Sequence, residues 1–405
     1  MELNFPLILD GATGTQLQKR GYDGTDCAER WILEHPEAIL EIQRAYVEAG
    51  SRVLYAPTFG ANRVKLEAHG IFNRVEEYNR RLAGLSREAA DGRAWVAGDM
   101  APTGLLLYPL GETSFEELVE IYTEQAAALE AAGVDLFVIE TMMTVAEARA
   151  AVLAVRSVSK KPVFVSFTCD EKGRTLTGSD VTAVLQILQG MGVEAFGLNC
   201  SVGPKELTAQ LKRLGEISRV PLIAKPNAGI PEIRGGETVY DCPPAEFTAY
   251  LAEMAAAGVA VFGGCCGTEA SHIKALAEGT RGLQLRAPAP RFAERLPCAT
   301  EKELFFLPTD TPIGEVLPCD EELESRLEDA MEEERPVIAL AIREAAELDS
   351  FADCQYLIGK PLCLVCEDAE LLEQALRLYQ GRAMYEGSLP EPQLEPLAAR
   401  YGLIY

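Results

Sequence analysis

The sequence predicts an α/β protein: a (β/α)8 TIM barrel followed by a small α/β module at the C-terminus. Short apolar runs alternate with amphipathic segments up to about residue 282, which is typical of strands alternating with helices. Eight such strand–helix pairs can be counted, the number that closes a TIM barrel. No G-x-G-x-x-G motif follows the first strand, so a doubly wound open sheet is the less favoured alternative.

The eight apolar runs have the length of buried strands. They are Leu7–Asp10, Arg52–Thr58, Ala94–Asp99, Leu136–Glu140, Val163–Thr168, Ala195–Asn199, Leu222–Lys225 and Val259–Phe262. Between them lie segments such as 35–50, 113–133 and 243–258, in which apolar residues recur at helical spacing. A glycine ends each of these three segments, as expected at the C-cap of a helix.

The C-terminal part of the chain is expected to be a second domain. Residues 285–297 are rich in proline and lack periodicity, so we interpret them as a linker between a barrel at 1–290 and a module at 300–405. Alternation then resumes, which suggests half of a barrel or a small α/β sandwich. The expected elements are a helix at 320–334, strands at 336–342, 361–366 and 382–385, and helices at 367–379 and 392–400.

Composition and charge exclude several classes of partner. The formal net charge is −25, and residues 301–405 contribute −16 of it, with 24 acidic and 8 basic residues. Such a surface repels phosphate, so neither nucleic acid nor an anionic membrane is expected to bind. No run approaches the about 20 apolar residues that span a bilayer, and the N-terminus lacks the features of a signal peptide. With 11 cysteines, an odd number, we expect reduced thiols and a cytoplasmic location.

The barrel prediction places function at the carboxyl ends of the strands. Polar or thiol side chains end or follow most of the expected strands: Asp10, Thr58, Asp99, Glu140, Thr168–Cys169, Asn199–Cys200, Asn227 and Cys265–Cys266. In a closed barrel these side chains converge on one mouth.

Three of these residues, Cys200, Cys265 and Cys266, have the properties of a zinc site. Adjacent cysteines form a strained disulfide, but two thiolates at one strand end can point to a shared metal. A third thiolate completes the three protein ligands that catalytic zinc usually has beside one open position. Burial as small apolar side chains is the alternative; the barrel-top position and the flanking glycines favour zinc.

Five segments also resemble a known family: residues 8–21, 35–70, 197–204 (GLNCSVGP), 225–232 (KPNAGIPE) and 261–276 (VFGGCCGTEASHIKAL). They are similar to the homocysteine-binding domain of cobalamin-dependent methionine synthase, within the homocysteine S-methyltransferases. The resemblance spreads over residues 1–282. It implies that a zinc-bound substrate thiolate attacks a methyl group, giving methionine without a separate protein nucleophile.

The resemblance also assigns roles to residues around the cysteines. Asp10, Gly11 and Glu140 would bind the amino-acid end of homocysteine, with the backbone N–H groups of 11–15 offered to its carboxylate. Asn227 would be a fourth zinc ligand without substrate, although asparagine in P-N-A-G is equally good turn chemistry. We expect Asn199 to orient Cys200 or its loop.

The methyl donor is left open by the residues themselves. The resemblance favours methylcobalamin on a separate corrinoid protein; S-methylmethionine, S-adenosylmethionine and a betaine-type donor are the alternatives. A non-catalytic protein that binds zinc and thiols is a further alternative, whereas a cysteine-nucleophile hydrolase lacks a histidine placed as base. Residues 361–405 weakly resemble a fragment of a pterin-binding barrel, so the module is interpreted as degenerate.

Overall fold

The computed structural model describes residues 3–108, 111–234, 237–292 and 294–405, which form two compact units. The first unit comprises Met1–Thr175 and Glu194–Ala289, and the second comprises Leu176–Val193 and Pro290–Tyr405. The chain therefore leaves the first unit at residue 176, returns to it at residue 194 and leaves it again at residue 290.

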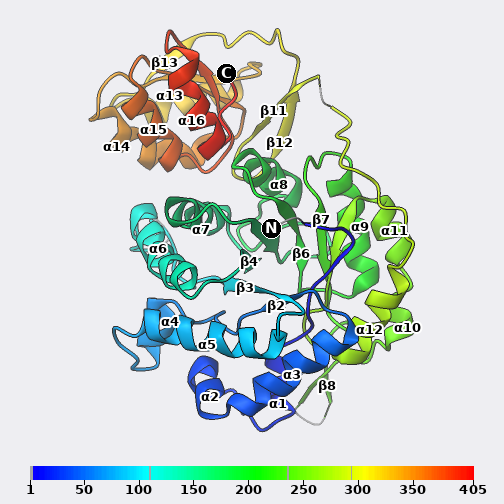
Figure 1. Cartoon of the computed structure of the whole chain (residues 1–405). Helices are drawn as coiled ribbons and strands as arrows, with labels where there is room; N and C mark the ends of the chain where they lie inside the picture. Colours follow the sequence, from blue (N-terminus) through cyan, green and yellow to red (C-terminus); the bar gives the residue numbers. More distant parts are fainter. Residues whose placement is uncertain (1–2, 109–110, 235–236, 293) are drawn as a thin grey trace. The chain divides into compact units, whose positions relative to one another are not determined.

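The first unit contains the predicted barrel (Figure 1). Its eight strands are β1 (Leu7–Ile8), β2 (Val53–Tyr55), β3 (Trp95–Met100), β4 (Leu136–Met142), β5 (Val163–Phe167), β6 (Ala195–Asn199), β7 (Leu222–Lys225) and β10 (Val259–Phe262). All neighbouring strands pair in parallel, in the order β1-β10-β7-β6-β5-β4-β3-β2. Each coincides with one of the eight expected runs, so the predicted fold class is confirmed.

The barrel is nearly closed, and the closing contact lies between the two end strands β1 and β2. The backbone N–H of Arg52 donates to the carbonyl of Ile8 over 2.7 Å. At the other end of β2, the N–H of Tyr55 donates to the side-chain Oδ2 of Asp10, also over 2.7 Å. A carboxylate thus takes the place that a strand carbonyl would occupy in a continuous ladder.

Side chains from the strands fill the centre of the barrel. Alternate residues of a strand point to the same face, and eleven buried side chains meet in one cluster: Leu7, Leu9, Val53, Tyr55, Ala97, Leu136, Val138, Phe164, Ala195, Ile223 and Val261. The interior is therefore a packed core, and polar groups are left to the strand ends.

The helices of this unit follow the amphipathic segments of the sequence. They are α1 (Gly14–Gln18), α2 (Ala28–Glu34), α3 (Pro36–Ala49), α4 (Arg63–Ala68), α5 (Val75–Ala90), α6 (Phe115–Ala131), α7 (Val145–Val158), α9 (Pro204–Gly215), α10 (Pro244–Phe247), α11 (Leu251–Ala256) and α12 (Ala270–Gly279). Proline begins α3, and Gly50 ends it in a left-handed conformation with φ 113°, as the sequence predicts.

The structure differs from the expectations for this unit at two places. Residues 243–258 form α10 and α11 instead of one helix; at the break, the hydroxyl of Thr248 donates back to the carbonyl of Pro244 over 3.0 Å. Between β7 and α10 the chain also forms an antiparallel hairpin of β8 (Glu232–Arg234) and β9 (Glu237–Val239), which the sequence did not predict.

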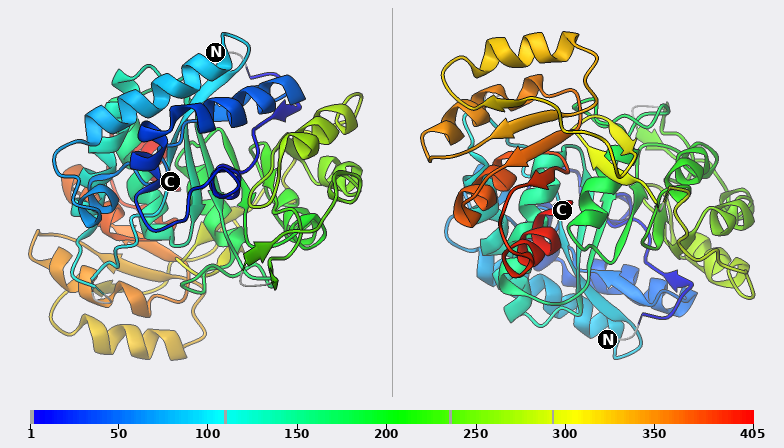
Figure 2. Two further views of the ribbon diagram at one scale, coloured as in Figure 1. Left: turned by 90° about the horizontal axis from the view of Figure 1, so that it is seen from below. Right: turned by 90° about the horizontal axis from the view of Figure 1, so that it is seen from above.

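The second unit contains a four-stranded parallel sheet with the strands in chain order. They are β13 (Val316–Pro318), β14 (Ile338–Ala341), β15 (Leu362–Val365) and β16 (Met384–Glu386), and β11 (Leu296–Ala299) pairs with β12 (Leu304–Leu307) in a separate antiparallel hairpin. The helices are α8 (Val181–Gly190), α13 (Leu323–Glu332), α14 (Glu347–Cys354), η1 (Gln355–Leu357), α15 (Ala369–Leu378) and α16 (Glu391–Tyr401). Figure 2 shows the yellow-to-red helices beside these strands.

Helix α8 belongs to the second unit although it lies between two barrel strands in sequence. It packs against β11, β12 and α16, and the backbone N–H of Asp180 donates to the carbonyl of Lys302 over 2.9 Å. A Cβ atom added at Gly190 would lie 3.2 Å from the Cα of Gly402, so the two segments approach closely. The boundary predicted at 290–300 remains a proposal, and α8 is an additional element of the C-terminal unit.

Among the described residues, no helix is both long and apolar enough to cross a membrane.

Gly197 in β6 is expected to tolerate no side chain. A Cβ atom there would lie 2.0 Å from the carbonyl oxygen of Ile223 in β7, so Gly197→Ala must separate the two strands. We expect the free energy of unfolding to fall by about 1–3 kcal/mol, measured by thermal denaturation. Gly84→Ala is the control: Gly84 is exposed in α5 with open space around it, and alanine there should stabilise by about 0.5–1 kcal/mol. Equal effects of the two substitutions would contradict this account of β6.

Candidate metal centre

The loops after β6 and β10 bring three thiols together. The Sγ atoms of Cys200, Cys265 and Cys266 all lie within 4.8 Å of one another, and those of Cys200 and Cys266 are 3.8 Å apart. Throughout the described ranges, no other three His, Cys, Asp or Glu side chains cluster in this way. All three cysteines are half-buried. The structure therefore brings together the three cysteines that the sequence predicted as metal ligands.

The end of β7 holds both cysteine loops through backbone hydrogen bonds. Cys200 N–H donates to the carbonyl of Lys225 over 3.1 Å, and Cys265 N–H donates to that of Pro226 over 2.8 Å. Ala228 N–H in turn donates to the carbonyl of Cys266 over 2.9 Å. Because β7 lies between β6 and β10 in the sheet, these bonds fix the separation of the two loops.

Backbone strain concentrates at this site. Five described residues other than glycine have positive φ. Thr141, Cys200 and Ser201 are three of them, with φ between 58° and 61°. A β-branched residue such as threonine rarely adopts this conformation, which costs about 1–3 kcal/mol per residue. Tertiary contacts must therefore hold the end of β4, which contains Thr141, and the loop after β6.

Asn199, the last residue of β6, supplies several of those contacts. Its Oδ1 accepts hydrogen bonds from the N–H of Thr141 (3.0 Å) and the hydroxyl of Ser166 (2.9 Å). Its Nδ2 donates to Thr141 Oγ1 over 2.7 Å and lies 3.9 Å from the Sγ of Cys265. The amide thus contacts the thiol of Cys265, and the predicted role of Asn199 in orienting Cys200 or its loop stays a prediction.

Tyr240 and Gly267 form the other side of the thiol cluster. The side chain of Tyr240 interacts with the thiol of Cys266. Gly267, which follows Cys266, has φ 79°, and a Cβ atom there would lie 2.3 Å from Tyr240. Glycine is therefore required at this position both for the turn and for the approach of the phenol ring.

The three thiols have raised pKa values. Hydrogen bonding to Cys200, followed by burial, raises the pKa of Cys265 to about 12. For Cys200 the hydrogen bond with Cys265 lowers the pKa, but the contact with Cys266 and burial outweigh it, and the pKa rises to about 11. Neighbouring thiolates repel one another. Three thiolates in this space would thus need a cation to compensate their charge.

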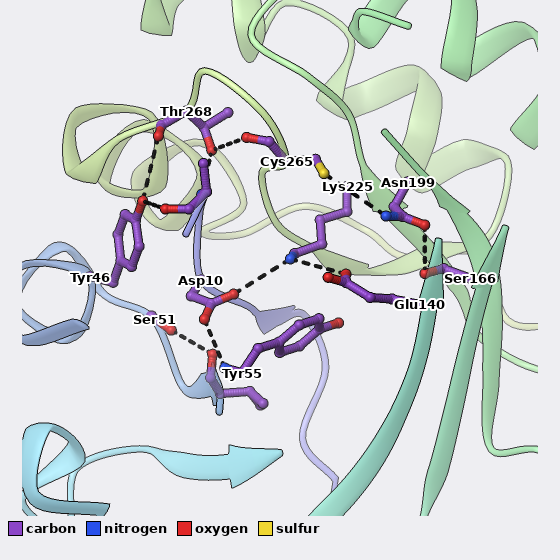
Figure 3. A network of polar contacts seen from close by, with 12 residues as sticks. Asp10, Tyr46, Ser51, Tyr55, Glu140, Ser166, Asn199, Lys225, Cys265 and Thr268 are labelled. Carbon is purple, nitrogen blue, oxygen red and sulfur yellow. Dashed lines mark hydrogen bonds and ion pairs between the residues drawn. The ribbon is translucent and has the colours of Figure 1, made fainter. Parts of the chain in front are cut away.

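A second polar group lies deeper in the mouth of the barrel (Figure 3). Lys225, the last residue of β7, places its Nζ 3.6 Å from Oδ1 of Asp10 and 3.4 Å from Oε2 of Glu140. The ammonium also lies 4.0 Å from the centre of the Tyr55 ring. All four side chains are buried. The structure brings Asp10 and Glu140 together as predicted and adds a lysine between them.

Burial and charge perturb the acids of this group. Burial raises the pKa of Asp10 to about 6, against the lowering effect of Lys225. Burial also raises the pKa of Asp99 well above its usual range, and Glu140 adds to this effect. Burial alone would lower the pKa of Lys225, but Glu140 and Asp10 outweigh it and raise the pKa. The carboxylate of Asp10 and the ammonium of Lys225 therefore stabilise each other.

Lys225 was not predicted as a site residue. A charged residue at the end of the apolar run Leu222–Lys225 was the available signal, because a lysine in a buried strand is unusual without a partner.

The remaining predicted residues lie beside these two groups. Gly11 follows β1 and is buried, and a Cβ atom there would lie 2.8 Å from the ring of Tyr46. In the adjoining loop, the N–H of Ala12 already donates to Thr268 Oγ1 over 3.0 Å. Asn227 is buried, and its Oδ1 has no hydrogen-bond partner among the described residues. A turn role alone does not account for a buried, unpartnered amide oxygen.

Residues 7–280 match the homocysteine S-methyltransferase family. The methionine synthase of Mycobacterium leprae (strain TN) is 33% identical over 291 residues, covering 67% of this chain and 24% of the relative. That of Mycobacterium tuberculosis (strain ATCC 25618 / H37Rv) is 32% identical over 298 residues, covering 69% and 25%. The chain thus spans about a quarter of the length of these relatives.

Solved structures are also similar to this chain. The homocysteine methyltransferase MmuM from Escherichia coli, in its metallated form, matches with a TM-score of 0.58 and 26% identity, covering 67% of this chain and 95% of that protein. Its oxidised form gives a TM-score of 0.58 at 27% identity over the same shares.

Asn199→Ala should loosen the end of β4, where Thr141 lies. The substitution leaves the N–H of Thr141 and the hydroxyl of Ser166 without their acceptor, so we expect the free energy of unfolding to fall by about 1–3 kcal/mol. Ser166→Ala is the matched control because it removes only one hydrogen bond to the same amide, worth about 0.5–1.5 kcal/mol. Thermal denaturation of both variants measures the difference, and a smaller loss for Asn199→Ala would show that the amide is not the support of this strand end.

Proposed function

This chain belongs to the homocysteine S-methyltransferase family, and on that premise we propose that it transfers a methyl group to the thiol of homocysteine, using zinc held by Cys200, Cys265 and Cys266. The observation that carries the proposal is the convergence of these three thiols within 4.8 Å. Thiolates are soft ligands that favour zinc over magnesium or calcium. Three protein ligands leave one position for substrate, as in catalytic zinc sites.

The donor set fits a zinc ion in two respects. The three thiols lie next to one another and have raised pKa values. A bound cation would compensate the negative charge of the three thiolates. The buried Oδ1 of Asn227 has no partner among the described residues and could fill the fourth position before substrate arrives. When bound, zinc would supply the positive charge that deprotonates a thiol at neutral pH.

The protein's own residues then bind and orient the substrate. Asp10 and Glu140 face the mouth of the barrel and would hold the ammonium of homocysteine by charge-assisted contacts. The sulfur would be directed toward Cys200, Cys265 and Cys266. In the reaction a bond forms between this sulfur and the methyl carbon, while the bond from methyl to donor breaks and its electron pair leaves with the donor.

We infer that the donor is a methylcorrinoid carried by another protein or domain. Support comes from relatives named methionine synthase, of whose length this chain spans about a quarter. The decisive experiment is a donor screen with homocysteine, with and without an added methylcorrinoid protein. Turnover with S-methylmethionine, S-adenosylmethionine or betaine in place of the corrinoid would replace this choice of donor. No turnover with any donor, despite bound zinc and homocysteine, would favour a non-catalytic thiol-binding role.

Zinc content should depend on each of the three cysteines. We expect one zinc per chain in the unaltered protein and a loss of most of it in Cys200→Ser, Cys265→Ser and Cys266→Ser, because no fourth cysteine joins the cluster. Zinc is quantified per chain by elemental analysis. Cys354→Ser, in the second unit and half-buried, is the control and should retain the metal. Full zinc in any two of the three cluster variants would refute the ligand assignment.

Homocysteine binding should release about one proton, because zinc takes the thiolate and not the thiol. Titration calorimetry near pH 7 in buffers of different ionisation enthalpy measures this release. Homoserine, which has a hydroxyl in place of the thiol, is the control and should bind weakly and release no proton. Proton-neutral binding of homocysteine would mean that its sulfur does not reach the metal.

A further inference from the structure

Lys225 lies where the substrate's amino-acid end is expected, yet its ammonium is only loosely held. Its two contacts with carboxylates are 3.6 Å and 3.4 Å long, whereas a charge-assisted hydrogen bond between such groups is about 2.7–2.9 Å. The side chain is 5% exposed. An ammonium has three N–H donors, so this buried group has donor capacity that Asp10 and Glu140 do not saturate.

The two acids of the site can bind only one of the two charged groups of the proposed substrate. Homocysteine carries both an ammonium and a carboxylate at the same carbon. Asp10 and Glu140 alone would attract the first and repel the second. Of the described lysines only Lys225 is buried, and it lies between these two acids. With its charge included, the site offers an opposite charge to each end of a zwitterion.

The path of the Lys225 side chain matches the span that the substrate must cover. Its backbone carbonyl accepts the N–H of Cys200, so one end of the residue lies at the thiol cluster. Its ammonium lies at Asp10 and Glu140, as Figure 3 shows. A substrate with its sulfur at the cysteines and its ammonium at the acids must extend alongside this side chain. Its carboxylate then comes within reach of Nζ.

We propose that Lys225 determines substrate specificity by binding the α-carboxylate of homocysteine, and thereby selects thiols that carry an amino-acid group over simple aminothiols. The inference rests on the proposed function of the site. In the protein without substrate, the same ammonium keeps Asp10 and Glu140 in place. When homocysteine binds, its carboxylate becomes a third partner of Lys225 Nζ. The ammonium of homocysteine then contacts Asp10 and Glu140.

The test compares homocysteine with 3-aminopropane-1-thiol, which lacks only the carboxylate. Dissociation constants are measured by titration calorimetry on the zinc-loaded full chain and on Lys225→Met, Lys225→Gln and Lys225→Arg, each checked first for zinc content and melting temperature. We expect both neutral variants to bind homocysteine roughly 10–100-fold more weakly, as for a lost hydrogen bond to a charged group. The aminothiol should bind no more weakly than before. Lys225→Arg keeps the charge and should keep the preference for homocysteine.

Each other outcome has a definite meaning. If the neutral variants weaken both ligands equally, Lys225 only supports the acids and the inference is wrong. If they strengthen both ligands, the lysine merely competes with the substrate ammonium, which also overturns it. Because Lys225→Met and Lys225→Gln differ in polarity, one of them can still be measured if the other fails to fold. Failure of the unaltered, zinc-loaded protein to bind homocysteine would instead reject the proposed function itself.

Discussion

The hydrogen bond from the Tyr55 amide to the Asp10 carboxylate constrains both the barrel and its mouth. It joins β2 to the segment after β1, where the sheet has few backbone bonds to close it. The other oxygen of the same carboxylate faces Lys225. Because one side chain serves both contacts, the closure of the barrel and the placement of charge in its mouth are coupled. The position of Lys225 beside both cysteine loops extends this coupling to the thiols.

The backbone of this site is held by contacts within the protein itself. The left-handed conformations of Thr141, Cys200 and Ser201 are unfavourable on their own, and they persist because Asn199 and the end of β7 hold the loops. Preorganised donors and ligands avoid a reorganisation cost at the moment of reaction. The strained backbone and the buried charged side chains are thus held by the same strand ends.

Much of this arrangement could be predicted from the sequence. Parallel strands in a barrel bring their carboxyl ends to one rim, so Cys200 and Cys265 could be placed together from strand order alone. The contact of Asn199 with Cys265 and the reach of Lys225 could not, because they depend on side-chain conformations that no spacing encodes. In the C-terminal unit β14, β15, β16, α13, α15 and α16 were foreseen, whereas β11, β12, β13 and α14 were not. Strand β11 was hidden in a proline-rich stretch that includes Pro297. The packing of α8 in that unit depends on contacts with residues far away in the sequence, which local periodicity does not encode.

The membership of α8 in the second unit has a consequence for biosynthesis. The ribosome completes this helix long before it makes β11, β12 and α16, the elements against which the helix packs. At roughly 5–20 residues per second, on the order of ten seconds pass between these events. During that time the part of α8 that packs against these elements lacks its final partners. The nascent chain therefore carries an unpacked helix between two strands that belong to the barrel.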